Sequence, residues 1–247
     1  MLSIIKFLLT WPYLVHLFYK SWRLAKKVKR DPEELPEEER YLWIKKRARY
    51  LCWLFGIKIK VHGLQNLPKN KSFILVSNHQ SFFDPLILFK VINSRKYAPL
   101  VFIAKKELKQ QRQTKNFLQL VNVLFIDRQN PRQALNLISE TVKLLHENKR
   151  IVVIFPEGTR SHSRKINEFR GGVYEIATNA QVQVAPLSIV NSYNFKPKFK
   201  NLWKSRKTVH VVFHKSFSDE ELLLMKKTLF LKKLKEVIEL GVEKLHD

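Results

Sequence analysis

The sequence predicts an α/β fold in which a mixed, mostly parallel sheet is flanked by helices and is preceded by an N-terminal two-helix hairpin. Two observations lead to this prediction. From Lys58 onward, short apolar runs alternate with amphipathic stretches, as strands alternating with helices do. Before Lys58 there are two long stretches rich in apolar, aromatic and basic residues. We therefore expect an N-terminal two-helix motif at residues 1–57 and an α/β domain at residues 58–247.

The first predicted helix is apolar at its start and basic at its end. Residues 1–19 are mostly apolar, and residues 20–30 follow with six lysines and arginines. Basic residues directly after an apolar segment favour the cytoplasmic side and attract anionic lipid headgroups. Lys6 and Pro12 interrupt a stretch that is barely long enough to span a bilayer. We therefore expect contact with a membrane phospholipid surface on the cytoplasmic face of the cell membrane, as a peripheral, monotopic hairpin or a single N-terminal anchor.

The second predicted helix is rich in aromatic and basic side chains. The acidic stretch 31–40, with its two prolines, predicts a turn or linker before it. Residues 41–55 then mix tyrosine, tryptophan and phenylalanine with lysine and arginine, a composition that suits the headgroup region of a bilayer. A core-packing helix with a solvated outer face is the alternative that this pattern leaves open. Together the two segments predict a membrane-binding helical hairpin.

Seven short apolar runs predict the strands of the sheet. They are residues 58–62, 73–77, 100–104, 123–126, 151–155, 182–190 and 208–213. Between them, residues 132–148 carry apolar side chains at spacings of three and four, with Asn130 as a candidate cap and Pro131 in the first turn. A last helix is predicted over residues 219–245, because Ser218 and Glu221 have the spacing of a capping box. Its buried stripe would consist of Leu231, Leu234, Ile238 and Val242.

The composition limits the classes of partner and site. The chain has 46 lysines and arginines against 21 acidic residues, a formal net charge of +25. Such an excess indicates an anionic partner, which by charge alone can be nucleic acid, a phosphorylated metabolite or a membrane surface. A single cysteine, Cys52, excludes an intramolecular disulfide framework and a cysteine-rich zinc site.

The densest chemical signal is the segment 78–85, which directly follows the predicted strand at residues 73–77. Histidine is the natural general base at neutral pH, and a carboxylate bonded to one ring nitrogen fixes its tautomer. Four residues separate His79 from Asp84, enough for a turn that folds the carboxylate back onto the imidazole. The alternatives are an ordinary polar loop residue for His79 and, because proline follows, a helix N-cap for Asp84. Asp84 can serve in both roles.

A second signal, residues 155–161, follows the strand predicted at residues 151–155. Its proline and glycine shape a tight turn, and Gly158 lets backbone N–H groups approach an anion. Arg160 adds a forked donor suited to phosphate. Glu157 can accept a hydrogen bond from a hydroxyl or hold the arginine. A plain turn with a surface ion pair is the alternative.

Two further predicted strands end in cations. Arg128 follows Asp127 at the end of one strand, and Lys105 and Lys106 follow another. Because the carboxyl ends of parallel strands share one edge of a sheet, these cations would gather beside the histidine–aspartate pair. That convergence predicts a phosphate-binding site next to a general base. The sequence contains no Gly-x-Ser-x-Gly elbow, so a serine or cysteine nucleophile is poorly supported.

These motifs, taken in order, resemble those of a known family. The matching segments are residues 78–84, 125–128, 155–161 and 185–189. They are similar to the four ordered motifs of the glycerolipid acyltransferases, and most of all to the branch of 1-acylglycerol-3-phosphate, or lysophosphatidic acid, acyltransferases. The likeness extends over residues 58–213.

The resemblance implies roles for particular residues. His79 and Asp84 take the catalytic roles. The positions that match substrate-binding residues of the family are Lys105, Arg128, Glu157, Gly158, Thr159 and Arg160. The chain departs from the usual pattern at four positions, none of which belongs to the proton-transfer pair. They are Asn122, Arg164, Glu168 and Ala185.

The resemblance also implies a reaction. A fatty acyl group would move from a thioester donor, acyl-CoA or acyl carrier protein, to the free hydroxyl of lysophosphatidic acid, giving phosphatidic acid in phospholipid biosynthesis. His79 would take the hydroxyl proton while Asp84 stabilises the imidazolium, without an acyl-enzyme. No metal, no tightly bound cofactor and no nucleic-acid partner is implied. A lipid or thioester hydrolase is the nearer alternative, and a basic nucleic-acid-binding protein is the more distant one.

Overall fold

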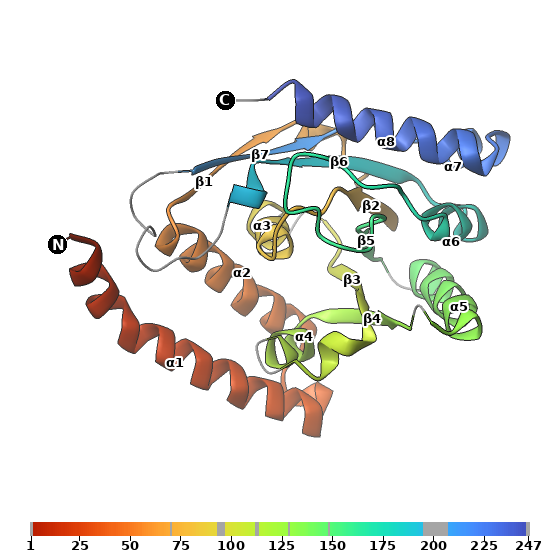
Figure 1. Ribbon diagram of the computed structural model, residues 1–247. Coiled ribbons are helices and arrows are strands. Elements are labelled where there is room, and N and C mark those ends of the chain that lie inside the picture. Colours follow the sequence, from red (N-terminus) through yellow and green to blue (C-terminus); the bar gives the residue numbers. More distant parts are fainter. Residues whose placement is uncertain are drawn as a thin grey trace.

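The chain folds into a seven-stranded sheet with helices on both faces (Figure 1). The computed structural model describes residues 2–69, 71–92, 97–111, 114–127, 129–147, 149–194 and 207–245. The strands lie in the order β1-β7-β6-β2-β5-β3-β4. Neighbouring strands are parallel except β6 and β7, which are antiparallel. The predicted α/β fold with a mixed, mostly parallel sheet is confirmed.

The predicted strands are all present, with ends that agree to within two residues. They are β1 (Ile57–His62), β2 (Phe73–Ser77), β3 (Leu100–Lys105), β4 (Asn122–Ile126), β5 (Ile151–Ile154), β6 (Val184–Val190) and β7 (Lys207–Phe213). The described α-helices are α1 (Leu2–Arg30), α2 (Glu37–Leu54), α3 (Asp84–Val91), α4 (Lys115–Leu120), α5 (Pro131–Glu147), α6 (Gly172–Ala180), α7 (Asp219–Leu224) and α8 (Lys227–Glu243). Short 3₁₀ turns lie at Pro32–Glu34, Leu64–Asn66, Lys106–Lys109 and Ser192–Asn194.

Alternate residues of the strands face two separate hydrophobic cores. On one face, Phe73 and Leu75 of β2 pack with side chains of α2, α3 and α4. On the other face, Ile74 and Val76 pack with side chains of α5, α6 and α8. Because strands covered on both faces have no solvent side, their sequences are continuously apolar rather than alternating. β2 lies near the middle of the sheet, so the segment that follows it emerges between helices of both layers.

The N-terminal segments form the predicted pair of helices, and Figure 1 shows α1 and α2 running in opposite directions. The linker between them is shorter than the sequence predicts, because residues 37–40 already form the first turn of α2. Acidic side chains are favourable there, since the backbone dipole is positive at a helix N-terminus. The ring of Tyr13 on α1 lies 4.5 Å from the ring of Tyr50 on α2, between centroids. Among the described residues, no helix combines the length and the apolar character needed to cross a bilayer.

The second helix is also a core helix. Its residues Tyr41, Ile44, Ala48 and Cys52 are buried and belong to the same core as β2 and α3. The core-packing alternative therefore holds for this face, whereas Trp53 on α2 is 59% exposed. Burial raises the pKa of the Cys52 thiol to about 11. The change in amino-acid pattern near residue 57 does not mark a boundary between two cores, because residues on both sides of it pack in the same core.

The start of α5 is confirmed as predicted. The side-chain oxygen of Asn130 accepts the backbone N–H groups of Arg132 at 3.1 Å and of Gln133 at 3.3 Å. Two of the N–H groups that a helix leaves unpaired at its start are thereby satisfied.

The prediction of one continuous C-terminal helix is wrong, because the chain forms α7 and α8 instead. The capping box predicted at Ser218 opens α7, but the backbone becomes extended at Met225 before α8 begins. In a continuous helix, Leu222 and Leu234 would point about a third of a turn apart. The break lets both side chains enter the same core.

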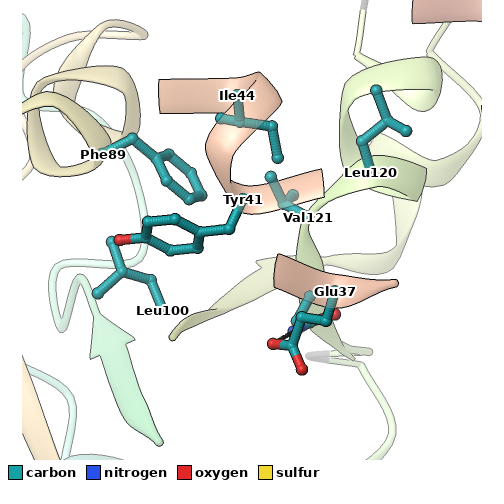
Figure 2. A pocket seen from close by; sticks show the side chains of 8 residues that line it. Glu37, Tyr41, Ile44, Phe89, Leu100, Leu120 and Val121 are labelled. Atoms are coloured by element: carbon teal, nitrogen blue, oxygen red, sulfur yellow. Dashed lines mark hydrogen bonds between the residues drawn. The ribbon is translucent and has the colours of Figure 1, made fainter. Parts of the chain in front are cut away.

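A small pocket lies between α2, α3, α4 and the starts of β3 and β4, as Figure 2 shows. Its lining consists of Glu37, Tyr41, Ile44, Phe89, Leu100, Leu120, Val121 and Asn122. The amide of Asn122 donates a hydrogen bond to the carboxylate of Glu37. Leu100 and Asn122 begin their strands, so this pocket lies at the edge of the sheet opposite to the segment that follows β2.

Candidate active site

The candidate site lies where four neighbouring strands end. β2, β5, β3 and β4 are adjacent and parallel, so the segments that follow them leave the sheet at one edge. His79 follows β2, Glu157 follows β5, and Lys105 is the last residue of β3. The predicted placement of these strand ends along one edge is confirmed. Arg128, predicted beyond the end of β4, lies outside the described residues.

His79 and Asp84 are hydrogen-bonded between Nδ1 and Oδ2 at 2.8 Å. The same carboxylate oxygen accepts the backbone N–H groups of Gln80 and Ser81, each at 2.8 Å. Three donors on one oxygen fix the carboxylate inside the turn. The Asp84 side chain is fully buried, whereas that of His79 is 19% exposed. The pair therefore presents the imidazole, and not the carboxylate, to solvent.

The N-cap role predicted for Asp84 is wrong. α3 begins at Asp84 itself, and Phe83 is the N-cap residue. The carboxylate turns back toward Gln80 and Ser81, so it closes the turn that precedes the helix. Its negative charge at the start of α3 is still favoured by the helix dipole.

The geometry determines which nitrogen of His79 can act on a substrate. An ionised carboxylate only accepts hydrogen bonds, so Nδ1 carries the proton that it donates to Asp84. In the neutral ring, Nε2 then keeps a lone pair and can take a proton. The imidazole stacks on the ring of Phe155, with centroids 4.2 Å apart and planes at 21°. This contact holds the ring in one orientation, which suits general-base catalysis.

The segment after β5 holds the backbone of His79 on both sides. Oε1 of Glu157 accepts the N–H of His79 at 2.7 Å, and the N–H of Ser161 donates to the carbonyl of His79 at 2.9 Å. Oε2 of Glu157 accepts the N–H of Asn167 at 2.9 Å. Gly158 has a φ of +71°, which glycine adopts readily and other residues rarely do. Burial raises the pKa of Glu157.

Two polar residues of this loop are exposed, unlike the buried Glu157. Thr159 and Arg160 are exposed, and Arg160 directly precedes the residue whose N–H contacts the carbonyl of His79. The guanidinium is therefore carried by a loop that is fastened to the catalytic turn, although no described contact fixes the Arg160 side chain itself.

The lysines at the end of β3 have different surroundings. Lys105 is partly buried and lies two strands from β2, which corresponds to about 10 Å at about 4.8 Å per strand. Lys106 forms an ion pair with Asp127, the residue after β4. Lys106 therefore ties the ends of β3 and β4 together beside Lys105.

Sequence reasoning missed Asn78 as a functional residue. Its Nδ2 donates to the carbonyl of Ile189 at 2.9 Å, and its Oδ1 accepts the N–H of Ile189 at 2.8 Å. Both residues are fully buried. The side chain thus continues the pairing of β2 with β6 by one step beyond Ser77 and fixes the residue that precedes His79. The signal in the sequence that could have pointed to Asn78 is its position, since it is a polar residue directly after a strand of buried residues.

Three of the departures from the usual family pattern make contacts elsewhere. Asn122 bonds to Glu37 of α2, and Nε of Arg164 donates to the hydroxyl of Tyr193 at 2.8 Å. Glu168 forms an ion pair with Lys235 of α8. Ala185 is buried in β6. None of these contacts involves the His79 side chain, and that of Asn122 lies at the opposite edge of the sheet.

Two histidines outside the site, His62 and His210, form a pair. Nε2 of His62 lies 3.2 Å from Nδ1 of His210, and their ring planes differ by 5° with centroids 5.4 Å apart. The two nitrogens therefore face each other in line, as in an N–H···N bond, rather than converging on an ion. Within the described ranges, no group of three or more His, Cys, Asp or Glu side chains is arranged to hold a metal ion.

Comparison with known proteins gives a consistent set of relatives. A family model described as Acyltransferase matches residues 58–190. A probable 1-acyl-sn-glycerol-3-phosphate acyltransferase of Mycoplasma pneumoniae is 34% identical over 206 residues, which cover 83% of this chain and 76% of that protein. The human 1-acyl-sn-glycerol-3-phosphate acyltransferase alpha is 34% identical over 144 residues, 58% of this chain and 49% of that protein.

A solved structure matches the whole fold. The crystal structure of the 1-acyl-sn-glycerophosphate acyltransferase PlsC from Thermotoga maritima aligns with a TM-score of 0.71 at 25% identity. The alignment covers 99% of both chains, so it includes the N-terminal helices as well as the sheet.

Proposed function

The chain belongs to the acyltransferase family, and we propose that it transfers a fatty acyl group from a thioester donor to the free hydroxyl of lysophosphatidic acid, giving phosphatidic acid. The resemblance predicted from the ordered motifs is confirmed by the family model and the relatives. The observation that carries the proposal is the hydrogen bond of 2.8 Å between His79 and Asp84 at the edge where parallel strands end. The names of the relatives supply the acceptor class.

The geometry supports a direct transfer. Nε2 of His79 takes the proton of the acceptor hydroxyl as the hydroxyl oxygen forms a bond to the thioester carbonyl carbon. The tetrahedral intermediate then breaks its carbon–sulfur bond, and the thiolate leaves with the proton from the imidazolium. Asp84 holds the ring and stabilises its positive charge between these steps. The alcohol attacks the thioester itself, so no acyl-enzyme forms.

The acceptor phosphate would bind at the cations of the same edge. Lys105 and Arg160 would supply charge, and the turn at Gly158 and Thr159 would supply backbone N–H groups. Arg128, which lies outside the described residues, is assigned to the same role by the family resemblance alone. Each charge-assisted hydrogen bond to phosphate contributes about 1.5–3 kcal/mol.

Membrane docking by the N-terminal hairpin is part of the proposal. Several large side chains of α1 are exposed, among them Trp11 at 51%, Phe18 at 64% and Trp22 at 38%. Cations accompany the aromatic rings, since Nζ of Lys26 lies 4.0 Å from the ring centroid of Trp22. Apolar rings next to basic groups fit the interface of a bilayer that contains anionic lipid. We place the enzyme on the cytoplasmic face as a monotopic protein.

The test is an assay of the purified chain with lysophosphatidic acid and each of two donors, acyl-CoA and acyl carrier protein. Phosphatidic acid is the expected product, and mass spectrometry identifies it. His79→Ala should abolish turnover while acceptor binding remains, because only the base is lost. Release of free fatty acid in place of phosphatidic acid would favour the hydrolase alternative. An active His79→Ala variant would refute the mechanism.

A further inference from the structure

The carboxylate of Glu157 is already used by the protein itself. Oε1 accepts the N–H of His79 at 2.7 Å, and Oε2 accepts the N–H of Asn167 at 2.9 Å. The residue is 4% exposed. A substrate hydroxyl could bond to this carboxylate only by entering a buried position, where each oxygen already accepts a backbone N–H.

The contacts of the segment after β5 converge on one residue. Glu157 holds the N–H of His79, Ser161 holds its carbonyl, and Phe155 stacks on its ring. Asp84 accepts a hydrogen bond from Nδ1 of the imidazole. The imidazole is thus fixed through its ring and through both sides of its backbone.

We propose that Glu157 is a positioning residue, which acts on the reaction through the backbone of His79 and not by contact with the acceptor. It ties the proton-transfer histidine to the loop that carries Arg160 and to the segment before α6. This inference takes the reaction from the proposed function, but the bonds on which it stands belong to the folded chain alone.

The chemistry of the two donors explains why a carboxylate is needed. Both partners of Glu157 are backbone N–H groups, and a carboxylate offers an acceptor to each. Glutamine has one carbonyl oxygen and one NH₂ group, so one backbone N–H would face another donor. Glu157→Gln therefore breaks one of the two bonds while it conserves size and shape.

Steady-state kinetics separate positioning from acceptor binding. The assay uses a short-chain, soluble lysophosphatidic acid, so that membrane binding does not limit the rate. We expect Glu157→Gln to lower kcat about 10- to 100-fold, since small displacements of a catalytic group have effects of this size. The KM for the acceptor should stay within about twofold of the wild-type value. A KM that rises about tenfold with kcat unchanged would show direct acceptor contact and overturn the proposal.

The chain offers a matched control on the same loop. Glu168 is 90% exposed at its side chain and pairs with Lys235, away from His79. Glu168→Gln makes the same chemical change and should leave both kcat and KM at their wild-type values. An equal fall in kcat in both variants would mean that the loop responds to any loss of charge, and would overturn the specific role of Glu157.

Unfolding experiments show whether a loss of kcat reflects damage to the fold. Burial raises the pKa of Glu157, so the folded chain binds a proton at this carboxyl more tightly than the unfolded chain does. The contribution of this group to stability is therefore full at low pH and is lost as pH rises through its folded pKa. Relative to the ionised carboxylate, glutamine removes the buried charge as well as one hydrogen bond. We expect the Tm of Glu157→Gln to lie close to that of the wild type.

Amide hydrogen exchange tests the inference without any substrate. The N–H of His79, of Asn167 or of both should exchange about tenfold or more faster in Glu157→Gln than in the wild type, and Glu168→Gln should change neither. Unchanged exchange at both His79 and Asn167 would refute the inference, even if the enzyme acylates lysophosphatidic acid. Faster exchange in a chain that fails to acylate this acceptor would instead leave the positioning role intact and refute the proposed function.

Discussion

Asn78 provides a quantitative test of how the catalytic turn is anchored. Its amide makes two hydrogen bonds to the backbone of Ile189, at 2.9 Å and 2.8 Å, and both residues are fully buried. Asn78→Ala leaves the N–H and the carbonyl of Ile189 buried without these partners, at a cost of about 1–3 kcal/mol each. Allowing for some relaxation, we expect the free energy of unfolding to fall by about 2–4 kcal/mol. For a chain of this size, the Tm would fall by roughly 5–15 °C.

Thermal or urea unfolding measures this change, with Asn130→Ala as the control. Asn130 also accepts two backbone N–H groups, but at the exposed start of α5, where loss of a cap costs about 1 kcal/mol. Asn78→Asp adds a second test, because it keeps an acceptor for the N–H of Ile189 but places an oxygen against its carbonyl. It should therefore also destabilise the fold. If Asn78→Ala proved as stable as Asn130→Ala, the idea that this amide closes the β2–β6 ladder would be wrong.

Two further outcomes are expected. Arg160→Ala should raise the KM for lysophosphatidic acid about ten- to hundredfold, because a charge-assisted bond to the acceptor phosphate is lost. The KM for the donor should stay nearly unchanged. A rise in the donor KM instead would mean that the loop binds the donor's phosphates. Replacing Trp11, Phe18 and Trp22 by serine should weaken binding to phosphatidylglycerol-containing vesicles about hundredfold, at about 1 kcal/mol for each half-exposed ring. Sedimentation with vesicles measures the binding, and the double variant Leu223→Ser/Leu224→Ser on α7 is the control. Wild-type binding by the triple variant would exclude α1 as the docking surface.

The sheet could be predicted from the sequence because its strands are buried on both faces. Such strands appear as uninterrupted apolar runs, and β2 and β5 show this most clearly. The break between α7 and α8 could not be predicted in the same way. The residues around Met225 are good helix formers, and only the requirement that Leu222 and Leu234 reach one core ends the helix there.

The histidine–aspartate bond could be predicted because the two residues belong to one short turn. Its geometry depends on local spacing, and the turn brings Asp84 within 2.8 Å of His79. The contacts of Asn78 and Glu157 are different in kind. Asn78 bonds to a residue 111 positions away, and Glu157 bonds to a backbone N–H 78 positions away. Side chains that bind a distant backbone leave no periodic or local pattern in a sequence, so only the fold shows them.

The hairpin and the catalytic turn are packed directly against each other, which has a consequence for membrane docking. The ring of Phe55, at the end of α2, lies 5.1 Å from that of Phe83, the residue before Asp84. The ring of Tyr41 on α2 lies 5.2 Å from that of Phe89 on α3, the helix that Asp84 begins. With α1 docked in the interface, this packing would set the height of the catalytic pair above the lipid. Removing residues 1–57 would expose these rings and strip part of the core, so substitution of exposed side chains is the appropriate way to separate docking from catalysis.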